Sequence, residues 1–183
     1  MSAPLLFSGR QVGAAVRALL IATVVLGLAY PLLITGAAQL IAPGRADGSL
    51  VEVDGQVVGS TLIGQSFTDT DGDPLPQYFQ ARPSASGYDG AASGGSNLGP
   101  NSRALADLIA PRRAEVAPFN GVDPADVPPD AVTASASGLD PGISPAYAAI
   151  QVDRVAAARG VPAAEVADLV QQATTGRDLG FIG

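Results

Sequence analysis

The sequence predicts an α+β protein in which one N-terminal transmembrane helix precedes a compact extracytoplasmic domain with a small sheet and two to three packed helices. An uncharged apolar run at 18–44 predicts the membrane helix, and alternating apolar residues around a turn at 49–63 predict a hairpin. Apolar residues at helical spacing near the C-terminus predict the packed helices. We therefore divide the 183 residues into a short cytoplasmic N-terminus at 1–17, the transmembrane helix at 18–42 and the extracytoplasmic domain at 43–183.

The apolar run is long enough to cross a bilayer. Ala18 to Gly44 contains 27 residues without a formal charge. At ~1.5 Å per residue this helix would be roughly 40 Å long, against about 30 Å for the hydrocarbon core of a membrane. A cleaved signal peptide is the alternative, because Gly36 and Ala38 have the small-residue spacing of a cleavage site. The apolar run continues beyond them through Ile41, which favours an uncleaved anchor.

The charges that flank the run predict its orientation. Arg10 and Arg17 precede it, whereas Arg45 is followed at once by Asp47 and Glu52. Arginine excess is typical of the cytoplasmic side of a membrane helix. We therefore expect a single-pass protein of the cell membrane, with its N-terminus in the cytoplasm and its C-terminal domain outside.

Two features of the run predict contact with other membrane helices. Ala14, Ala18 and Ala22 recur at every fourth residue, a spacing that lets helices approach closely in lipid. Pro31 lies within the run and removes a backbone donor, so it is expected to kink the helix.

The composition excludes several classes of function. Residues 45–183 carry 8 arginines and 17 acidic residues, a formal charge of 8 − 17 = −9, which argues against nucleic acid and anionic lipid as partners. The chain has no cysteine and no histidine, so disulfides, thiol catalysis, a Ser-His-Asp triad and the usual zinc ligands are excluded.

Strand signals are short and widely spaced. Ser49 to Ile63 predicts a hairpin with Asp54-Gly55 as its turn. A short strand is expected at Tyr78 to Ala81, and a further strand at Val132 to Ser137. Between them, Ser84 to Pro100 is dominated by small and polar residues and predicts a long loop.

Helix signals dominate the second half of the chain. Asn101 or Ser102 can cap a helix that Pro111 should end or kink, and Val116 to Pro129 is rich in proline and is expected to be irregular. Ser144-Pro145 reads as an N-cap and first helical residue, with Gly160 ending that helix after Arg159. A last helix is expected from Pro162 to Thr175, and the two C-terminal helices are expected to pack across the small sheet.

Three motifs invite a chemical interpretation. Asp69, Asp71 and Asp73 fit the start of a calcium loop, but the positions that need glycine and a carboxylate hold Pro74 and Gln80, so a solvated acidic loop is favoured. The stretch from Ser93 to Asn97 exposes successive amides that could cradle an anion, although no P-loop lysine follows it and a turn-rich loop is the simpler reading.

Arg82 is the third motif. It lies between Tyr78-Phe79 and the rigid Pro83-Ser84, where its planar guanidinium could clamp a carboxylate or backbone carbonyls. An exposed arginine at a strand end explains the same spacing equally well.

Several segments, taken in order, carry a family resemblance. Gln151 and the following stretches match it: Tyr30-Pro31-Leu32; Gly59-Ser60; Leu62-Ile63-Gly64-Gln65; Tyr78-Phe79-Gln80-Ala81-Arg82-Pro83-Ser84; Tyr88-Asp89; Ser93-Gly94-Gly95-Ser96-Asn97-Leu98-Gly99-Pro100; Val132-Thr133-Ala134-Ser135; Ser137-Gly138-Leu139-Asp140-Pro141; Ile143-Ser144-Pro145-Ala146; Arg154-Val155-Ala156; and Ala158-Arg159-Gly160. In these stretches the chain resembles the C subunit of the Kdp high-affinity potassium-transporting P-type ATPase. Gly142 replaces the family's usual histidine, and Pro162 its usual serine cap.

The resemblance implies an accessory subunit that is not an enzyme by itself. Its implied partners are a channel-like potassium-translocating subunit, an ATP-hydrolysing P-type subunit, a small single-span subunit and membrane lipid. It implies no directly bound cofactor, because the complex handles ATP and potassium, and it implies a catalytic chaperone that raises the affinity of the ATP-hydrolysing subunit for ATP. The candidate interface or coupling residues are Gln65, Tyr78, Phe79, Arg82, Ser93, Asn97, Asp140 and Gln151; Ala14, Ala18, Ala22 and Pro31 are the candidates for membrane helix packing.

An outer domain cannot touch cytosolic ATP, so we expect any effect on nucleotide affinity to pass indirectly through the membrane helix. Two other classes remain open from the residues alone. One is a free extracytoplasmic binding protein released by signal cleavage. The other is an extracytoplasmic glycosidase that uses a pair of carboxylates.

Overall fold

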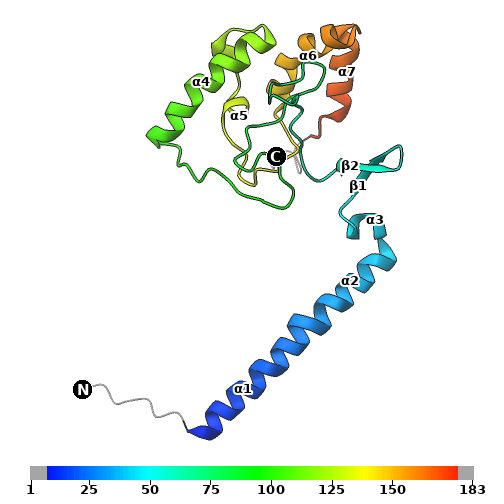
Figure 1. The fold of residues 1–183 in the computed structure, drawn as a ribbon, viewed down its shortest axis with the longest axis vertical. Helices are drawn as coiled ribbons and strands as arrows, with labels where there is room; N and C mark the ends of the chain where they lie inside the picture. Colours follow the sequence, from blue (N-terminus) through cyan, green and yellow to red (C-terminus); the bar gives the residue numbers. More distant parts are fainter. Residues whose placement is uncertain (1–7, 177–183) are drawn as a thin grey trace, which may run out of the picture. The chain divides into compact units, whose positions relative to one another are not determined.

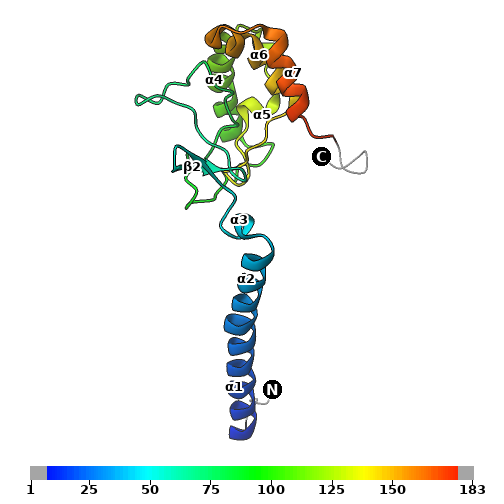
Figure 2. The ribbon, with the colours of Figure 1, turned by 90° about the vertical axis from the view of Figure 1, so that its right-hand side faces the viewer.

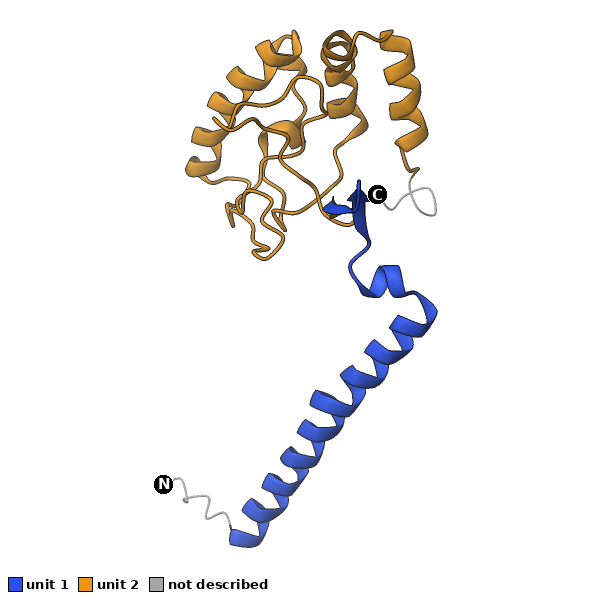
Figure 3. Ribbon diagram, turned by 45° about the vertical axis from the view of Figure 1, so that its right-hand side comes forward, with its two compact units in different colours: residues 1–58 blue, residues 59–183 orange. Residues whose placement is uncertain are grey.

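The computed structural model describes residues 8–176, and they fall into two compact units. The first unit is 1–58 and the second is 59–183 (Figure 3). The first seven residues of the predicted N-terminal segment at 1–17 lie outside the described residues. We describe each unit by itself.

A single long helix dominates the first unit (Figure 1). It comprises α1 (Gly9–Val24), the π-helical turn η1 (Val25–Ala29) and α2 (Tyr30–Ile41). This helix of 33 residues is long and apolar enough to cross a membrane, and none of its residues is buried. It starts at Gly9, so helical structure extends into the predicted N-terminal segment.

A π-helical turn lies just before Pro31, where the sequence predicts a kink. Proline lacks a backbone donor and crowds the carbonyl four residues earlier, which here belongs to Gly27. Gly27 lies inside η1, where the wider turn lets the helix continue on both sides. Pro31 is the second residue of α2 and directly follows this wider turn, so the missing proline donor falls where the helical bonding pattern changes.

The predicted hairpin is confirmed. After the short helix α3 (Pro43–Ala46), strands β1 (Leu50–Val53) and β2 (Gln56–Ser60) form a two-stranded sheet. Asp54 and Gly55 have φ values of 52° and 77°, the left-handed pair that a tight hairpin turn requires. Every residue of β1 is exposed.

Helices that pack on one another form the second unit (Figure 2). Its elements are α4 (Arg103–Asn120), the 3-10 turn η2 (Pro124–Asp126), α5 (Pro129–Val132), α6 (Pro145–Arg159) and α7 (Ala163–Ala173). Helix α6 packs against both α7 and α4. Most of the buried apolar residues form two clusters, one of Ala117, Val127, Ala131, Val132 and Tyr147, and a second of Val155, Ala156 and Val166.

The caps of α6 are as predicted. The Ser144 hydroxyl accepts a hydrogen bond from the Tyr147 amide at 3.0 Å, and Pro145 is the first helical residue. Gly160 ends the helix with φ 68°, a left-handed conformation that costs glycine little. The last helix also lies where expected, although Pro162 supplies no side-chain cap.

The structure of the second unit differs from several expectations. Residues 78–81 and 133–137 form no strand, and Val132 instead ends α5. Helix α4 passes Pro111 without ending and continues to Asn120, through residues expected to be irregular. Among residues 8–176, the hairpin contributes no residue to the two apolar clusters, and α6 and α7 pack on each other.

Tertiary contacts explain why α4 continues past the prolines within it. Ala117 is only 1% exposed and lies in the first apolar cluster, so ending the helix at Pro111 would forfeit its burial. A guanidinium nitrogen of Arg112 donates to the Val132 carbonyl at 3.0 Å and ties α4 to the end of α5.

Candidate functional site

Three of the predicted interface residues, Arg82, Asp140 and Gln151, lie in two polar networks of the second unit. We call Arg82, Ser84, Tyr88, Ser135 and Asp140 the Arg82 cluster. We call Gln80, Gln151, Arg154 and Asn120 the Gln151 network.

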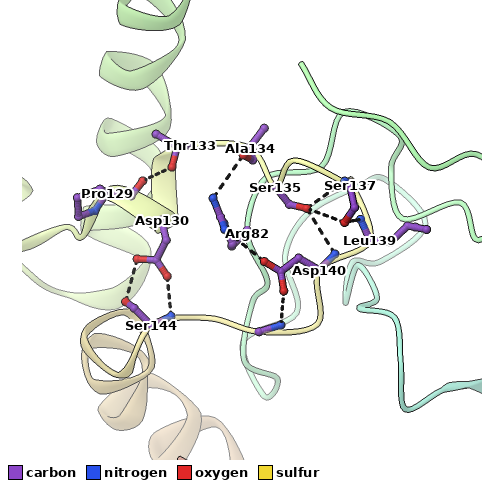
Figure 4. Close-up of polar contacts among 12 residues, drawn as sticks. Arg82, Pro129, Asp130, Thr133, Ala134, Ser135, Ser137, Leu139, Asp140 and Ser144 are labelled. Carbon is purple, nitrogen blue, oxygen red and sulfur yellow. Dashed lines mark hydrogen bonds and ion pairs between the residues drawn. The ribbon is translucent and has the colours of Figure 1, made fainter. Parts of the chain in front are cut away.

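Arg82 clamps both kinds of partner that its sequence context suggested (Figure 4). One terminal nitrogen lies 3.2 Å from a carboxylate oxygen of Asp140, and the other lies 3.4 Å from the carbonyl of Ala134. The two paired side chains are 26% and 39% exposed, so solvent screens the ion pair and its contribution to stability is about 1 kcal/mol at most. The pair joins two segments that lie 58 residues apart in the sequence.

Tyr88 links the two segments of the cluster that carry Arg82 and Asp140. Its hydroxyl lies 2.9 Å from the Arg82 carbonyl and 3.4 Å from the Asp140 carbonyl, and it donates its proton between them. Burial raises the pKa of the Tyr88 phenol, the Asp140 carboxylate raises it further, and the Arg82 guanidinium opposes the rise. The phenol therefore stays protonated at neutral pH and acts as a donor. Its φ of 59° is strained for an aromatic residue, which the surrounding contacts must offset.

Two serines hold the loop backbone of the cluster. The Ser84 hydroxyl donates to the Gly138 carbonyl at 2.7 Å and accepts from the Tyr88 amide at 3.0 Å. Ser135 is fully buried, and its hydroxyl accepts from the Gly138 amide at 3.0 Å. Gly138 has φ 71°, and a side chain there would meet the Gly94 carbonyl at 2.6 Å, so only glycine fits between these loops.

Donors of the Ser93–Asn97 stretch bind another loop of the same chain. The Gly94 amide and the Ser93 hydroxyl both donate to the Ser137 carbonyl, at 2.8 and 3.0 Å. These two donors are therefore committed to holding the loop rather than to an anion. Asn97 is exposed and has φ 53°, as asparagine in a turn often does.

The Gln151 side chain binds the backbone of residue 80 as a neighbouring strand would. Its side-chain oxygen accepts from the Gln80 amide at 2.7 Å, and its side-chain nitrogen donates to the Gln80 carbonyl at 3.1 Å. The Gln151 side chain is fully buried, so each of these bonds is costly to lose. The Gln80 side chain in turn donates to the carbonyls of Phe67 and Leu75, both at 3.1 Å.

Arg154 extends the Gln151 network to the neighbouring helix and loop. Its guanidinium donates to the side-chain oxygens of Gln151 and Asn120, at 2.7 and 2.9 Å, and to the carbonyls of Pro76 and Tyr78. The guanidinium carbon also lies 4.4 Å from the centre of the Phe119 ring. Burial lowers the pKa of Arg154, yet an arginine remains charged at any physiological pH.

The predicted aromatic pair separates in space. Tyr78 stacks on Phe67 with ring centres 4.7 Å apart, and the guanidinium of Arg159 lies 5.2 Å from the Tyr78 ring centre. Phe79 packs instead against the second apolar cluster. Gln65 is half-buried, and its amide occupies the space that a side chain at Gly59 would need. The two networks as we define them contain none of five predicted interface residues: Gln65, Tyr78, Phe79, Ser93 and Asn97.

The acidic loop folds around its own first residue. One side-chain oxygen of Asp69 accepts from the amides of Asp71 and Asp73, both at 2.9 Å. Among residues 8–176, no group of three or more acidic side chains is arranged to hold a metal ion.

Sequence reasoning did not select Gln80, Arg154, Ser84 or Ser135 as site residues. Gln80, Ser84 and Arg154 depend on partners 50 to 80 residues away, such as the Arg154 bond to Tyr78 across 76 residues. The Ser135 hydroxyl binds the Gly138 amide only three residues away, but its burial is set by the tertiary fold. A sequence signal existed only for Tyr88, the single bulky polar residue in a loop of small ones. Both networks satisfy their donors and acceptors mainly within the chain, an arrangement suited to holding a rigid surface.

Comparisons with known proteins point to one family. The family model described as the K+-transporting ATPase c chain, KdpC, matches residues 12–183. A potassium-transporting ATPase KdpC subunit from Kineococcus radiotolerans is 54% identical over 176 residues, covering 95% of this chain and 86% of the relative. That of Gemmatimonas aurantiaca is 58% identical over 160 residues, covering 86% and 77%. That of Streptomyces coelicolor is 45% identical, covering 100% of this chain and 90% of the relative.

Proposed function

This chain belongs to the KdpC family of K+-transporting ATPase subunits, and from that premise we propose how it serves such a complex. It is an accessory subunit and not an enzyme by itself. We propose that its long helix docks in the membrane against a potassium-translocating subunit, an ATP-hydrolysing subunit and a small single-span subunit. We also propose that the chain acts as a catalytic chaperone that raises the affinity of the complex for ATP.

The observation that carries the docking proposal is the long helix from Gly9 to Ile41. Its apolar side chains are exposed along its whole length, because no residue of α1, η1 or α2 is buried within the chain. Lipid or partner helices must therefore cover it. Ala14, Ala18 and Ala22 all lie in α1 at helical spacing and leave room for a close neighbour.

Replacing the small residues tests the docking. Ala18→Leu with Ala22→Leu adds bulk to the proposed contact, and we expect several-fold less complex to be recovered after gentle detergent extraction. Leu20→Phe is the control, because it enlarges an already large side chain on the opposite face of the same helix. Equal recovery of a potassium-stimulated ATPase from both variants would exclude docking through this stripe.

The proposed orientation places Arg10 and Arg17 in the cytoplasm and the second unit outside. The chain has no cysteine, so single cysteines report topology without background. In intact cells, Asp123→Cys should react with a membrane-impermeant reagent, whereas Ser8→Cys should react only after permeabilisation. The reverse pattern would overturn the orientation. The mass of the mature chain tests the rival reading, because a released binding protein would lack the helix.

An outer domain can influence ATP only indirectly, through the helix and its neighbours. We expect removal of this chain from the complex to raise the KM for ATP and its return to restore the lower value. Pro31→Leu, which restores a donor beside η1, should shift this KM while the complex stays assembled. Photolabelling of this chain by an azido-ATP analogue would instead favour direct contact with the nucleotide.

A further inference from the structure

The π-helical turn η1 leaves one backbone carbonyl of the long helix without its regular donors. In a π-helical turn each amide donates to the carbonyl five residues earlier, and the Tyr30 amide accordingly donates to the Val25 carbonyl. The next donor in this pattern would serve the Leu26 carbonyl, but it is Pro31, which has no amide proton. The α-helical donor to Leu26 would be Tyr30, whose amide is already bound to Val25. The Leu26 carbonyl therefore lacks both of its regular partners.

The shortage of donors extends to the next two carbonyls. The α-helical bonds resume at α2, where the N-cap residue Ala29 offers the first carbonyl. The carbonyls of Gly27 and Leu28 precede it, and the Leu32 amide, five and four residues further on, is the one regular donor that they share. Two acceptors therefore compete for one amide beside the unpaired Leu26 carbonyl.

No side chain of the chain supplies the missing donor. The Thr23 hydroxyl, one turn before Gly27, donates to the Leu19 carbonyl at 2.8 Å. Among residues 8–176, no side chain donates to the Leu26 carbonyl. The surface beside it is open, because Gly27 is exposed and a Cβ built there would meet only the Thr23 methyl group, at 3.8 Å. A neighbouring helix can therefore come close to the backbone at this turn.

The unpaired carbonyl lies deep in the apolar run. Leu26 follows Ala18 by eight residues and precedes Ile41 by fifteen. These separations correspond to about 12 and 22 Å of helix, at ~1.5 Å per residue. The lipid core holds no water and its acyl chains carry no donor, so an unpaired carbonyl is costly there. A polar side chain on a neighbouring helix can satisfy it at this depth.

We propose that η1 is a polar docking point within the membrane, where a helix of another subunit donates a side-chain hydrogen bond to the carbonyl of Leu26 or Gly27. The donor is a neutral hydroxyl or amide group of serine, threonine, asparagine or glutamine, because a charged donor is expensive in the lipid core. This inference rests on the proposed docking of the long helix and adds the chemistry of one contact. Pro31 fixes the face of the helix that meets the partner, since its missing amide opens these acceptors.

Photo-cross-linking locates the partner. The photoreactive residue p-benzoylphenylalanine in place of Tyr30 keeps an aromatic side chain one turn after Leu26. In membranes that contain the complex, irradiation should join it to a membrane segment of another subunit, with a candidate donor within about one helical turn of the joined residue. The same probe in place of Leu32, on the opposite face of the helix, is the control and should not join to that segment. Products with lipid alone, from an intact complex, would overturn the inference.

A double-mutant cycle tests the hydrogen bond itself. Pro31→Ala returns an amide to the helix, so the complex should still assemble but should no longer need the partner's donor. Each candidate donor near the cross-link is replaced in turn by alanine, and the rate at which this chain leaves the detergent-extracted complex is measured. Loss of the true donor should raise this rate about three- to tenfold beside Pro31, and less than about twofold beside Pro31→Ala.

Leu28→Ala is the matched control for lost packing. It also shortens a side chain next to η1 but keeps the proline, so the donor should retain its full effect in this background. If every candidate donor had equal effects beside Pro31 and Pro31→Ala, the inference would be overturned while the docking proposal stood. A chain that co-purifies with no ATPase subunit would overturn both.

Discussion

The long helix and the second unit are stabilised in different ways. Helix α1–η1–α2 has regular backbone bonds on either side of η1 and no buried residue, whereas the second unit has buried residues but long stretches without regular structure. Apart from η1, the helix needs only an apolar surrounding to be stable. The second unit must satisfy the backbone of its loops with side chains such as Gln151, Arg82 and Ser84.

The difference shows where each region is sensitive to mutation. In the helix, a polar group is costly wherever it meets lipid. In the second unit, apolar replacement of a buried polar side chain is costly because a backbone group loses its partner. A change from an apolar to a polar side chain is therefore costly in the helix, whereas a change from polar to apolar is costly at the buried polar positions of the second unit.

The largest effect is expected at Gln151. Gln151→Leu leaves the Gln80 amide and carbonyl and one Arg154 nitrogen without their bonds, so we expect a loss of about 3 to 5 kcal/mol of unfolding free energy. Urea unfolding of the full chain in detergent, followed by tyrosine circular dichroism, measures it. Gln171→Leu, on the exposed surface of α7, is the control and should cost less than about 0.5 kcal/mol. Similar costs for both would mean that the Gln80 pairing is unimportant.

The next largest effect is expected from a charge introduced into the long helix. Leu26 and Leu62 are 65% and 60% exposed, but only Leu26 lies in the proposed membrane segment. Leu26→Asp should cost about 3 kcal/mol of insertion free energy and release part of the chain on alkaline extraction of membranes. Leu62→Asp should leave retention unchanged. Full retention of Leu26→Asp would argue that a partner or water shields this position.

Alkaline pH should lower the unfolding free energy of the second unit through Tyr147. This residue is 3% exposed, and burial, as the largest cause, raises its pKa from 10.0 to about 12. Between these values the unfolded state binds fewer protons, so the unfolding free energy falls as pH rises, by about 2 to 3 kcal/mol in total. The chain has no lysine or cysteine that would titrate in the same range.

Urea midpoints measured from pH 9 to pH 12 report this loss. Tyr147→Phe should remove most of it, leaving a smaller contribution from Tyr88, whose pKa is also raised. A wild-type slope in Tyr147→Phe would assign the pH dependence to other groups.

The smallest effect is expected at the half-exposed ion pair. Asp140→Asn removes the charge opposite Arg82 and keeps the acceptor that the Gly142 amide uses at 2.9 Å. We expect a loss below about 1 kcal/mol that disappears in molar salt. Loss of the whole fold would show that the pair does more than a screened surface contact can do.

Local chemistry explains which parts of the fold were predictable. The hairpin at Asp54-Gly55 and the ends of α6 at Ser144 and Gly160 depend on residues that determine their own backbone conformation. Helix α4 was not predictable beyond Pro111, because its continuation depends on the burial of Ala117 and on the Arg112 bond to Val132.

The candidate site was predictable only in part for the same reason. Arg82 between rigid neighbours indicated a clamp, and the structure supplies its partners, Asp140 and Ala134. The Gln80–Gln151 pair joins positions 71 residues apart, and no spacing in the sequence signals it. The interface role of these residues stays a prediction.

Helix α6 also protects the chain against unwanted association. Gln151, Arg154 and Arg159 together bind the carbonyls of Pro76, Gln77, Tyr78 and Gln80. An extended segment with free carbonyls is a template on which a foreign strand can pair. Here side chains already occupy that edge, so an aromatic, strand-like sequence can lie near the surface without nucleating aggregates.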